Sequence, residues 1–372
     1  MRIKIDTENL RDALNKILTV IDKRNSRPIL TYTLFTVSNE RIYLSATDLE
    51  VSAKYSLNAE TEGNASFCIN AKNLFDILKE LPNTDIHMEL EDGENLLKIN
   101  CNDIHYSLLI YESEEYPNLH FGSDNKFQID SDNLSNLISK TSYAISNDET
   151  RLHFNGIFLQ EVETKLRAVA TDGHRLSLIE TDLSTENNEA LTNGVIIPRK
   201  GVYEIKKVAE SYPNTTLEVS VDDSYMYINA KEEYHLGIRL IAREYPKYQS
   251  VIPGKTTFTL TADKDAIFNA VKRIKIMSNE KSNGVKVLIK DNSLTVMANH
   301  PSLGDAMETI PVDYDDKEME IGFNAKYLMD SFSILEAEDV ILELNNELSP
   351  VIVRSNQLQN YIGIIMPLRI WF

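Results

Sequence analysis

The chain has 372 residues, 42% of them hydrophobic and 26% charged, and carries a formal net charge of −19 at pH 7. This length is more than one ordinary core accommodates and predicts two or three soluble globular domains. The sequence has no apolar run near the ~20 residues of a membrane helix, no secretory signal pattern, and no metal-type spacing of Cys68 and Cys101. We therefore exclude an integral membrane protein and expect a cytoplasmic protein without disulfides, metal or cofactor.

A strand followed by an amphipathic helix recurs along the chain. It occurs first at 3–21 and again at 127–145 and 258–276. Each segment has an alternating strand, then Ser, Thr or Asp at the N-cap position, then apolar residues at helical spacing. A second strand–helix segment follows each of them, at 67–81, 195–209 and 320–334. These patterns predict helices at 8–25, 70–80, 131–147, 198–211, 263–281 and 324–335.

Other landmarks repeat in the same order. The sequence Ala-Thr-Asp stands at 46–48 and 170–172, and Ala-Asn takes that place at 298–299. Glu-Tyr-Pro marks matching ends at 115–117 and 244–246. The repeats predict an α+β fold of three domains with one topology, each with two helices on one face of antiparallel sheet. The expected domains are 1–124, 125–253 and 254–372, hereafter the first, second and third copy.

The second Ala-Thr-Asp continues as Gly-His, which raises the question of catalysis. Asp172 and His174 could supply two members of a nucleophilic triad, but the chain has no G-x-S-x-G elbow. Its seven histidines form no H-E-x-x-H motif. Gly254-Lys255-Thr256 resembles the end of a phosphate loop, yet Gln249 stands where that loop needs Gly. These patterns favour a protein without an active site, and a hydrolase using Asp172 and His174 remains the alternative.

Positive charge concentrates in the expected helices. Basic residues outnumber acidic ones in 8–25, 198–211 and 263–281, and the other three helices are neutral, although the whole chain carries −19. Lysine on a helix can serve solubility alone. If equivalent helices share one face, however, that face is electropositive. Such a surface would contact DNA phosphates, which carry no sequence information, and would permit sliding.

The repeats and several motifs together resemble the bacterial beta sliding clamps, the beta subunits of DNA polymerase III. The resemblance runs from residue 1 to 370. Its most specific segments are RPIL (27–30), ATDGHRL (170–176), IPRKG (197–201), YPKYQSVIP (245–253), SNEK (278–281), MEIGFN (319–324) and MPLRI (366–370). The resemblance implies a head-to-tail homodimer that closes a six-domain ring around double-stranded DNA, holds it by topology without sequence specificity, and has no active site.

The resemblance also implies an apolar groove between the second and third copies. Partners would insert a short peptide there, usually Gln followed by Leu and Phe-type residues. The partners expected are the DNA polymerase III alpha subunit, the clamp loader delta subunit, other polymerases and mismatch-repair proteins, with no membrane partner. The matching groove positions are Phe154, Thr171, Gly173, His174, Arg175, Leu176, Pro246, Val251, Pro350, Ile364, Met366, Pro367, Leu368 and Arg369.

Two further surfaces follow from the same resemblance. Dimer contacts would use Tyr106 and Leu108 on one chain, and Ile276 and Met277 on the other. Residues facing DNA would be Arg24, Lys72, Lys140, Arg199, Lys200, Lys206, Lys272 and Arg273.

The chain departs from the family pattern at a few positions. Ser250 stands where an Arg often lines the groove, Phe154 replaces a smaller aliphatic residue, and Trp371-Phe372 extends past the usual end. Near the expected DNA-facing loop, Asp148 and Glu149 are acidic. We interpret the protein as a DNA sliding clamp that confers processivity on the replicative polymerase. A ring-shaped scaffold that binds peptides but is not loaded on DNA is a further alternative.

Overall fold

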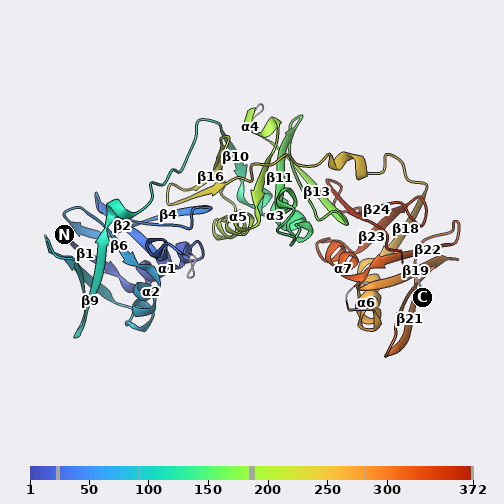
Figure 1. The fold of residues 1–372 in the computed structure, drawn as a ribbon, viewed down its shortest axis with the longest axis horizontal. Helices are drawn as coiled ribbons and strands as arrows, with labels where there is room; N and C mark the ends of the chain where they lie inside the picture. Colours follow the sequence, from blue (N-terminus) through green and yellow to red (C-terminus); the bar gives the residue numbers. More distant parts are fainter. Residues whose placement is uncertain (22–25, 92, 184–188, 281, 370–372) are drawn as a thin grey trace. The chain divides into compact units, whose positions relative to one another are not determined.

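The computed structural model describes residues 1–21, 26–91, 93–183, 189–280 and 282–369. Within these ranges, each strand pair is antiparallel. The chain packs as two compact units, and the second copy contributes strands to both (Figure 1). The first unit comprises Met1–Ser135, Ser184–Ala190 and Lys200–Leu240; the second comprises Asn136–Leu183, Leu191–Arg199 and Ile241–Phe372.

The first unit contains one large sheet. The described residues give it thirteen strands, and it joins all strands of the first copy to four from the second. In spatial order the strands are β10 (Lys126–Asp130), β15 (Thr216–Val221), β16 (Tyr225–Ala230), β17 (Tyr234–Arg239), β4 (Val51–Asn58), β3 (Arg41–Thr47), β2 (Tyr32–Ser38), β6 (Ala65–Asn70), β9 (Ile104–Glu112), β8 (Leu96–Cys101), β7 (Asp85–Leu90), β1 (Arg2–Asp6) and β5 (Glu60–Glu62).

The second unit contains two sheets, which together hold the rest of the second copy and the third. The larger has the order β14 (Val195–Pro198), β11 (Gly156–Val162), β12 (Lys165–Thr171), β13 (Arg175–Asp182), β25 (Tyr361–Ile365), β24 (Val351–Arg354), β23 (Asp339–Leu344) and β18 (Phe258–Asp263). The smaller has the order β21 (Gly304–Pro311), β20 (Ser293–His300), β19 (Gly284–Lys290) and β22 (Met319–Asn324).

Four of the described helices begin at a side-chain cap; Asp6 and Asp263 agree with the predicted Ser, Thr or Asp, whereas Asn70 and Asn324 were not predicted. The side chains of Asp6, Asn70, Asp263 and Asn324 each accept a hydrogen bond from an N–H of the first helical turn, which satisfies donors that the helix itself leaves unpaired. Buried residues recur on one face, and α1 packs against α2 as α6 packs against α7. The helices are α1 (Thr7–Leu18), α2 (Ala71–Glu80), α3 (Ser131–Thr141), α4 (Glu189–Thr192), α5 (Arg199–Ser211), α6 (Lys264–Ile274) and α7 (Ala325–Ser333).

Four helices end earlier than predicted, and one of them, expected at 324–335, ends at Ser333. Residues 22–25 and 281 of the predicted helices lie outside the described residues. The helix expected at 8–25 stops at Leu18, because the β-branched run Thr19, Val20 and Ile21 favours helix less than the residues before it. The helices expected at 131–147 and 263–281 stop at Thr141 and Ile274, and each tightens into a 3₁₀ turn. The short α4 was not predicted.

Neighbouring copies are joined by strand pairing. In the first unit, β4 of the first copy pairs with β17 of the second, with Val51 opposite Ile238. In the second unit, β13 of the second copy pairs with β25 of the third, with Arg175 opposite Ile365. We call these pairs, with the side chains around them, the first and second junctions. Each sheet therefore continues from one copy into the next.

Candidate functional site

The Ala-Thr-Asp sequence forms the same turn in both copies that carry it. The Oδ1 atom of Asp172 accepts hydrogen bonds from the N–H groups of His174 (2.9 Å) and Arg175 (3.1 Å). Asp48 accepts from the N–H groups of Glu50 (3.0 Å) and Val51 (2.8 Å) in the same way. A short carboxylate that bonds backbone two and three residues ahead stabilises a tight turn. The repeated Asp is therefore explained by structure, with or without a following His.

The second turn carries a buried charge network. Arg175 is 7% exposed; its Nε donates to Oδ2 of Asp172 (3.1 Å) and its Nη1 to Oδ2 of Asp330 on α7 (2.6 Å). The guanidinium also lies over the ring of Tyr327, 4.4 Å from its centroid. Both oxygens of Asp172 are thus engaged by the backbone and by Arg175. This geometry gives no support to Asp172 as the orienting acid of a catalytic His174.

An apolar cavity of about 280 Å³ lies beside this turn, in the second unit. Its floor is continuous with a buried cluster that includes Leu176 and Ile364. Nine residues that the sequence assigned to a groove line it: Phe154, Thr171, Gly173, Arg175, Leu176, Pro246, Val251, Ile364 and Met366. Three more residues complete the lining: Lys247, Tyr248 and Ser250. We call this cavity the groove.

Aromatic packing supports one wall of the groove. Tyr245 stacks on Phe158 with ring centroids 4.6 Å apart, and Phe154 meets Tyr245 edge-on at 6.5 Å. The hydroxyl of Tyr248 accepts a hydrogen bond from Arg167 (3.1 Å), which in turn pairs with Glu180 (2.6 Å). Burial raises the pKa of the Tyr245 hydroxyl. These aromatic contacts and hydrogen bonds fix the wall in place before a ligand binds.

The other five predicted groove residues do not line this cavity, and their role in a groove stays a prediction. Leu368 donates its backbone N–H to the carbonyl of Gly322 (2.8 Å), and this pairing carries Leu368 and Arg369 to a separate cavity of about 340 Å³. His174 turns its ring toward Tyr327, with centroids 6.4 Å apart, but its carbonyl accepts from the N–H of Met366 (2.9 Å). His174 thus positions a lining residue. Pro350 and Pro367 line neither cavity.

Sequence analysis missed Lys247 and Tyr248 as lining residues. Both lie within the quoted YPKYQSVIP segment, between Pro246 and Val251, which were assigned. The signal that could have found them is their place in this short segment, which winds into a 3₁₀ turn at Tyr248–Val251. With three residues per turn, such a turn keeps consecutive residues close to the same cavity.

Several of the basic residues expected to face DNA are already engaged within the protein. Lys140 is 4% exposed, so its assignment to DNA does not fit the structure. Its ammonium donates to the carbonyl of Ile334 and to Glu336 (2.7 Å), and that hydrogen bond lowers the pKa of the Glu336 carboxyl. Lys200 pairs with Asp48 and with the carbonyl of Val20. Lysine donors commonly satisfy helix-terminal carbonyls in this way.

The remaining candidates for DNA are more accessible. Lys72 pairs with Asp76, Lys206 with Glu210 (3.7 Å) and Arg273 with Glu308 (2.5 Å) across exposed surfaces, and surface pairs of this kind are weak. Lys272 is exposed on α6. Arg199 donates to the carbonyl of Ser146. Arg24 lies outside the described residues.

Among the strand edges that stay open within the described residues, those of β9 and β21 carry exposed apolar side chains. Residues Ile104–Leu109 of β9 pair with β8 alone, and β21 pairs with β20 alone. Exposed apolar side chains accompany both edges: Ile104 (39%), Leu109 (68%) and Tyr111 (46%) on β9, and Leu303 (65%), Met307 (67%) and Ile276 (75%) beside β21. The predicted Tyr106 and Leu108 lie on β9, and Met277 ends the turn after α6. Open edges with apolar side chains favour pairing with another chain.

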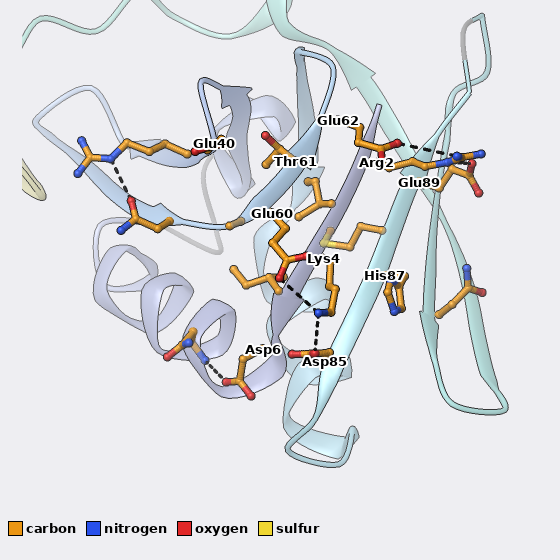
Figure 2. Close-up of a pocket in the computed structure, with 18 of the residues that line it drawn as sticks. Arg2, Lys4, Asp6, Glu40, Glu60, Thr61, Glu62, Asp85, His87 and Glu89 are labelled. Atoms are coloured by element: carbon orange, nitrogen blue, oxygen red, sulfur yellow. Dashed lines mark hydrogen bonds and ion pairs between the residues drawn. The ribbon is translucent and has the colours of Figure 1, made fainter.

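A polar cavity of about 1230 Å³ lies in the first unit, beside β1 and β5. Figure 2 shows its side chains already joined to one another, with Lys4 between Glu60 and Asp85 at 3.3 Å from each. Arg2 donates to Glu89 (2.8 Å), and this hydrogen bond lowers the pKa of the Glu89 carboxyl.

The described residues contain no group of three His, Cys, Asp or Glu that could hold a metal ion. None of their helices is long and apolar enough to cross a membrane.

Comparison with known proteins gives consistent matches. Models for the N-terminal, central and C-terminal domains of the DNA polymerase III beta subunit match residues 1–120, 128–247 and 249–369. The chain is 32% identical to a beta sliding clamp of Caulobacter vibrioides and 31% identical to one of Proteus mirabilis, covering 100% of both chains in each case. The Pseudomonas aeruginosa sliding clamp bound to griselimycin superposes with a TM-score of 0.94 at 27% identity, again over 100% of both chains.

Proposed function

Because the chain belongs to the DNA polymerase III beta subunit family, the sliding clamps, we propose that it encircles duplex DNA as a homodimer and confers processivity on the replicative polymerase. It acts without an active site of its own, in the cytoplasm, where DNA replication takes place. We also propose the domain bounds 1–124, 125–253 and 254–372, a division supported by the order of the three family-model segments.

The observation that carries the ring is the repeated mode of strand pairing. The first copy joins the second through β4 and β17, and the second joins the third through β13 and β25. The equivalent strands left over are β21 in the third copy and β9 in the first, and both have open edges in the described residues. Pairing β21 of one chain with β9 of another repeats the same junction. Two such pairings close a head-to-tail dimer.

The exposed apolar residues support this pairing. Leu109 on β9 and Met307 on β21 are 68% and 67% exposed in the single chain, and their burial would favour association by about 25 cal/mol per Å² of apolar area removed from water. We therefore add both to the dimer surface, together with Tyr106, Leu108, Ile276 and Met277. Replacing Leu109 or Met307 by Glu is expected to give a monomer in sedimentation measurements.

Retention on DNA would then depend on topology, with weak contacts to phosphates. We assign this role to the exposed Lys72, Lys272 and Arg273 and to the half-buried Lys206. Their contacts would be independent of sequence. A chain of −19 is suited to such weak contact, since its net charge opposes tight binding to DNA.

The groove would recruit partners by binding short peptides with Gln, Leu and Phe-type residues. Its apolar lining and preformed aromatic wall fit such anchors. Met366 adds a flexible side chain that can adapt to different partners. The griselimycin-bound relatives from Pseudomonas aeruginosa and Bartonella birtlesii support a ligand-binding capacity in this family. We expect the polymerase alpha subunit, the clamp loader delta subunit, other polymerases and mismatch-repair proteins as partners.

The test is retention on circular DNA. The protein is loaded on nicked circular plasmid by a bacterial clamp loader with ATP, separated by gel filtration, and the plasmid is then cut once with a restriction enzyme. Protein that stays on circles and leaves cut DNA supports the clamp; protein that stays on linear DNA contradicts it. The Leu109→Glu variant is the matched control and should not be retained on either.

A second function is favoured by one observation. Lys140 and Lys200 form ion pairs within the protein, so the basic surface available to DNA is smaller than the sequence suggested. A smaller basic surface fits a ring-shaped scaffold that binds peptides but is not loaded on DNA. A chain that dimerises and binds peptides, yet is not retained on circles by a loader proven on its own clamp, would establish the scaffold.

A further inference from the structure

One lysine at the first junction lacks the partners that its neighbours have. Lys200 pairs with Asp48, and Lys207 donates to the carbonyl of Lys16. Lys54 on β4 is half-buried, yet its ammonium makes no ion pair and no hydrogen bond within the part of the chain that the structure describes. Its charge has therefore lost part of its water without gaining an anion.

Strand geometry places Lys54 beside an aromatic and an imidazole ring. Val51 and Ala53 of β4 are buried, whereas Lys54 lies on the opposite face of the sheet. Its ammonium lies over the ring of Tyr43, 4.6 Å from the centroid. In the pairing of β4 with β17, Lys54 stands directly opposite His235, a position from which side chains of neighbouring strands interact.

A chain of hydrogen bonds holds His235 in place. Its Nδ1 lies 2.8 Å from Oδ1 of Asn229, and Nδ2 of Asn229 donates to Glu218 (3.2 Å). Because the amide nitrogen of Asn229 serves Glu218, its oxygen accepts from Nδ1–H of His235. Glu218 also pairs with Lys126 (3.1 Å). The carboxylate of this chain is thus bound to Lys126 and Asn229 and does not neutralise Lys54.

Burial without an anion favours the neutral amine of Lys54. It lowers the pKa of the Lys54 ammonium, although the ring of Tyr43 restores part of the lost stabilisation. Burial also lowers the pKa of His235, and the charge of Lys54 adds to that shift, while Glu232 and Glu218 oppose it. At neutral pH the amine is therefore more populated at Lys54 than at an exposed lysine. A lysine amine that has lost its proton is a nucleophile.

We propose that Lys54 is a modification site, whose side-chain amine takes an acyl group from small acyl phosphates without an enzyme. The lone pair of Nζ attacks the carbonyl carbon of the acyl phosphate, and the bond from that carbon to the phosphate oxygen breaks. The phosphate leaves with the electron pair, and a proton passes from Nζ through water to the phosphate. The product is an uncharged amide at Lys54. This reactivity depends neither on DNA binding nor on the groove.

The experiment follows acetylation of the full-length protein by acetyl phosphate between about pH 6.5 and pH 9.5. Samples are digested with a protease that cleaves at Glu, and each lysine is quantified by mass spectrometry. Lys290, exposed on β19, is the reference. Near pH 7.5, Lys54 should be acetylated at least about fivefold faster than Lys290. Its rate should also level off at a lower pH, which distinguishes a desolvated amine from one that is only accessible.

Variants of His235 sharpen the test. His235→Glu places a carboxylate opposite Lys54, which should stabilise the ammonium and slow acetylation at least about fivefold. His235→Gln keeps a donor for Asn229 without adding charge and should leave Lys54 fast. The matched charge control is His87→Glu at an exposed residue of β7, which should also leave the rate unchanged.

Two results overturn the proposal: Lys54 reacts no faster than Lys290, or Lys54 keeps its rate in His235→Glu. If the His235→Glu chain does not fold, the pH profile of the parent protein decides alone. A profile of Lys54 that matches that of Lys290 then overturns the proposal.

Discussion

The two junctions are built on the same turn and the same strand pairing, but the groove lies at the second. Thr47-Asp48 and Thr171-Asp172 make matching hydrogen bonds. The next residue takes a positive φ in both, +78° at Leu49 and +89° at Gly173. The first junction accepts a strained Leu there, whereas the second has Gly, and a Cβ would lie 3.1 Å from Nη1 of Arg151. Removing one side chain helps to open a binding site on a repeated scaffold.

The junctions also use charge in different ways. At the first, Lys207 on α5 donates to the carbonyl of Lys16 (2.6 Å) and to the hydroxyl of Thr19 (2.7 Å), at the end of α1. At the second, Lys140 on α3 donates to the carbonyl of Ile334, just after α7. Cations near helix C-termini are stabilising. Part of the positive charge of the helices thus holds neighbouring copies together.

The largest effect is expected from breaking the buried network of the second junction. Arg175→Met would remove the cation that Asp172 and Asp330 share. Asp172 is buried and would lose its ion pair, whereas the half-buried Asp330 would keep Lys326. Loss of one partner of a buried ion pair costs about 3–5 kcal/mol. Val51 already stands at the equivalent position of the first junction. Urea unfolding measures the effect, with the exposed Lys290→Met as control. A loss below about 1 kcal/mol would mean that the network contributes little.

Copying the first junction into the second should abolish binding with a smaller effect on stability. Gly173→Leu introduces at φ +89° the residue that the first junction carries at +78°, so the fold tolerates it at about 1–3 kcal/mol of strain. Its side chain would enter the groove beside Phe154. We expect at least tenfold weaker binding of a Gln-Leu-Asp-Leu-Phe peptide, measured by anisotropy. Leu49→Gly is the reciprocal control and should leave peptide binding unchanged.

Lysines that hold the copies together can be distinguished by mutation from lysines that contact DNA. Lys140→Met removes the ammonium from its carbonyl and Glu336 partners and should cost about 1–2 kcal/mol of stability with no effect on DNA. Lys272→Met, on the exposed face of α6, should do the opposite: stability stays within about 0.5 kcal/mol, and the loader places less protein on circular DNA as the salt concentration rises. If Lys140→Met reduces loading as much as Lys272→Met does, then Lys140 contributes to DNA contact and its role is not structural alone.

The sequence predicts the repeats well because strand alternation, helical spacing and caps such as Asp6 and Asp263 are local signals. It predicts nine groove residues because their positions follow a familiar motif order. It could not predict that Lys140 is buried, since that depends on where Ile334 and Glu336 come to lie after folding. It also could not separate Leu368 and Arg369 from the groove, because one backbone pairing with Gly322 redirects the chain.

The smallest expected effect concerns a buried acid at the first junction. Glu204 is 1% exposed on α5; its Oε2 accepts from Thr19 (3.0 Å) and lies 3.9 Å from the ammonium of Lys207. Its Oε1 has no hydrogen-bond partner among the described residues. Burial raises the pKa of this carboxyl above its ordinary value, although Lys207 and Thr19 oppose the shift. Folding therefore favours the protonated acid.

An acid whose pKa is raised by folding stabilises the protein below its unfolded pKa, about 4.3, and this contribution is lost as the pH rises through the folded value. Glu204→Gln removes the titration and keeps the shape. Its free energy of unfolding relative to the parent should increase from pH 4 to pH 8. Glu210→Gln, an exposed neighbour on α5, should show no such trend. If Glu204→Gln instead makes the protein less stable than the parent at pH 8, then the ionised Glu204 carboxylate stabilises the fold through its ion pair with Lys207. The first junction would then resemble the second, where buried carboxylates and a buried cation neutralise one another.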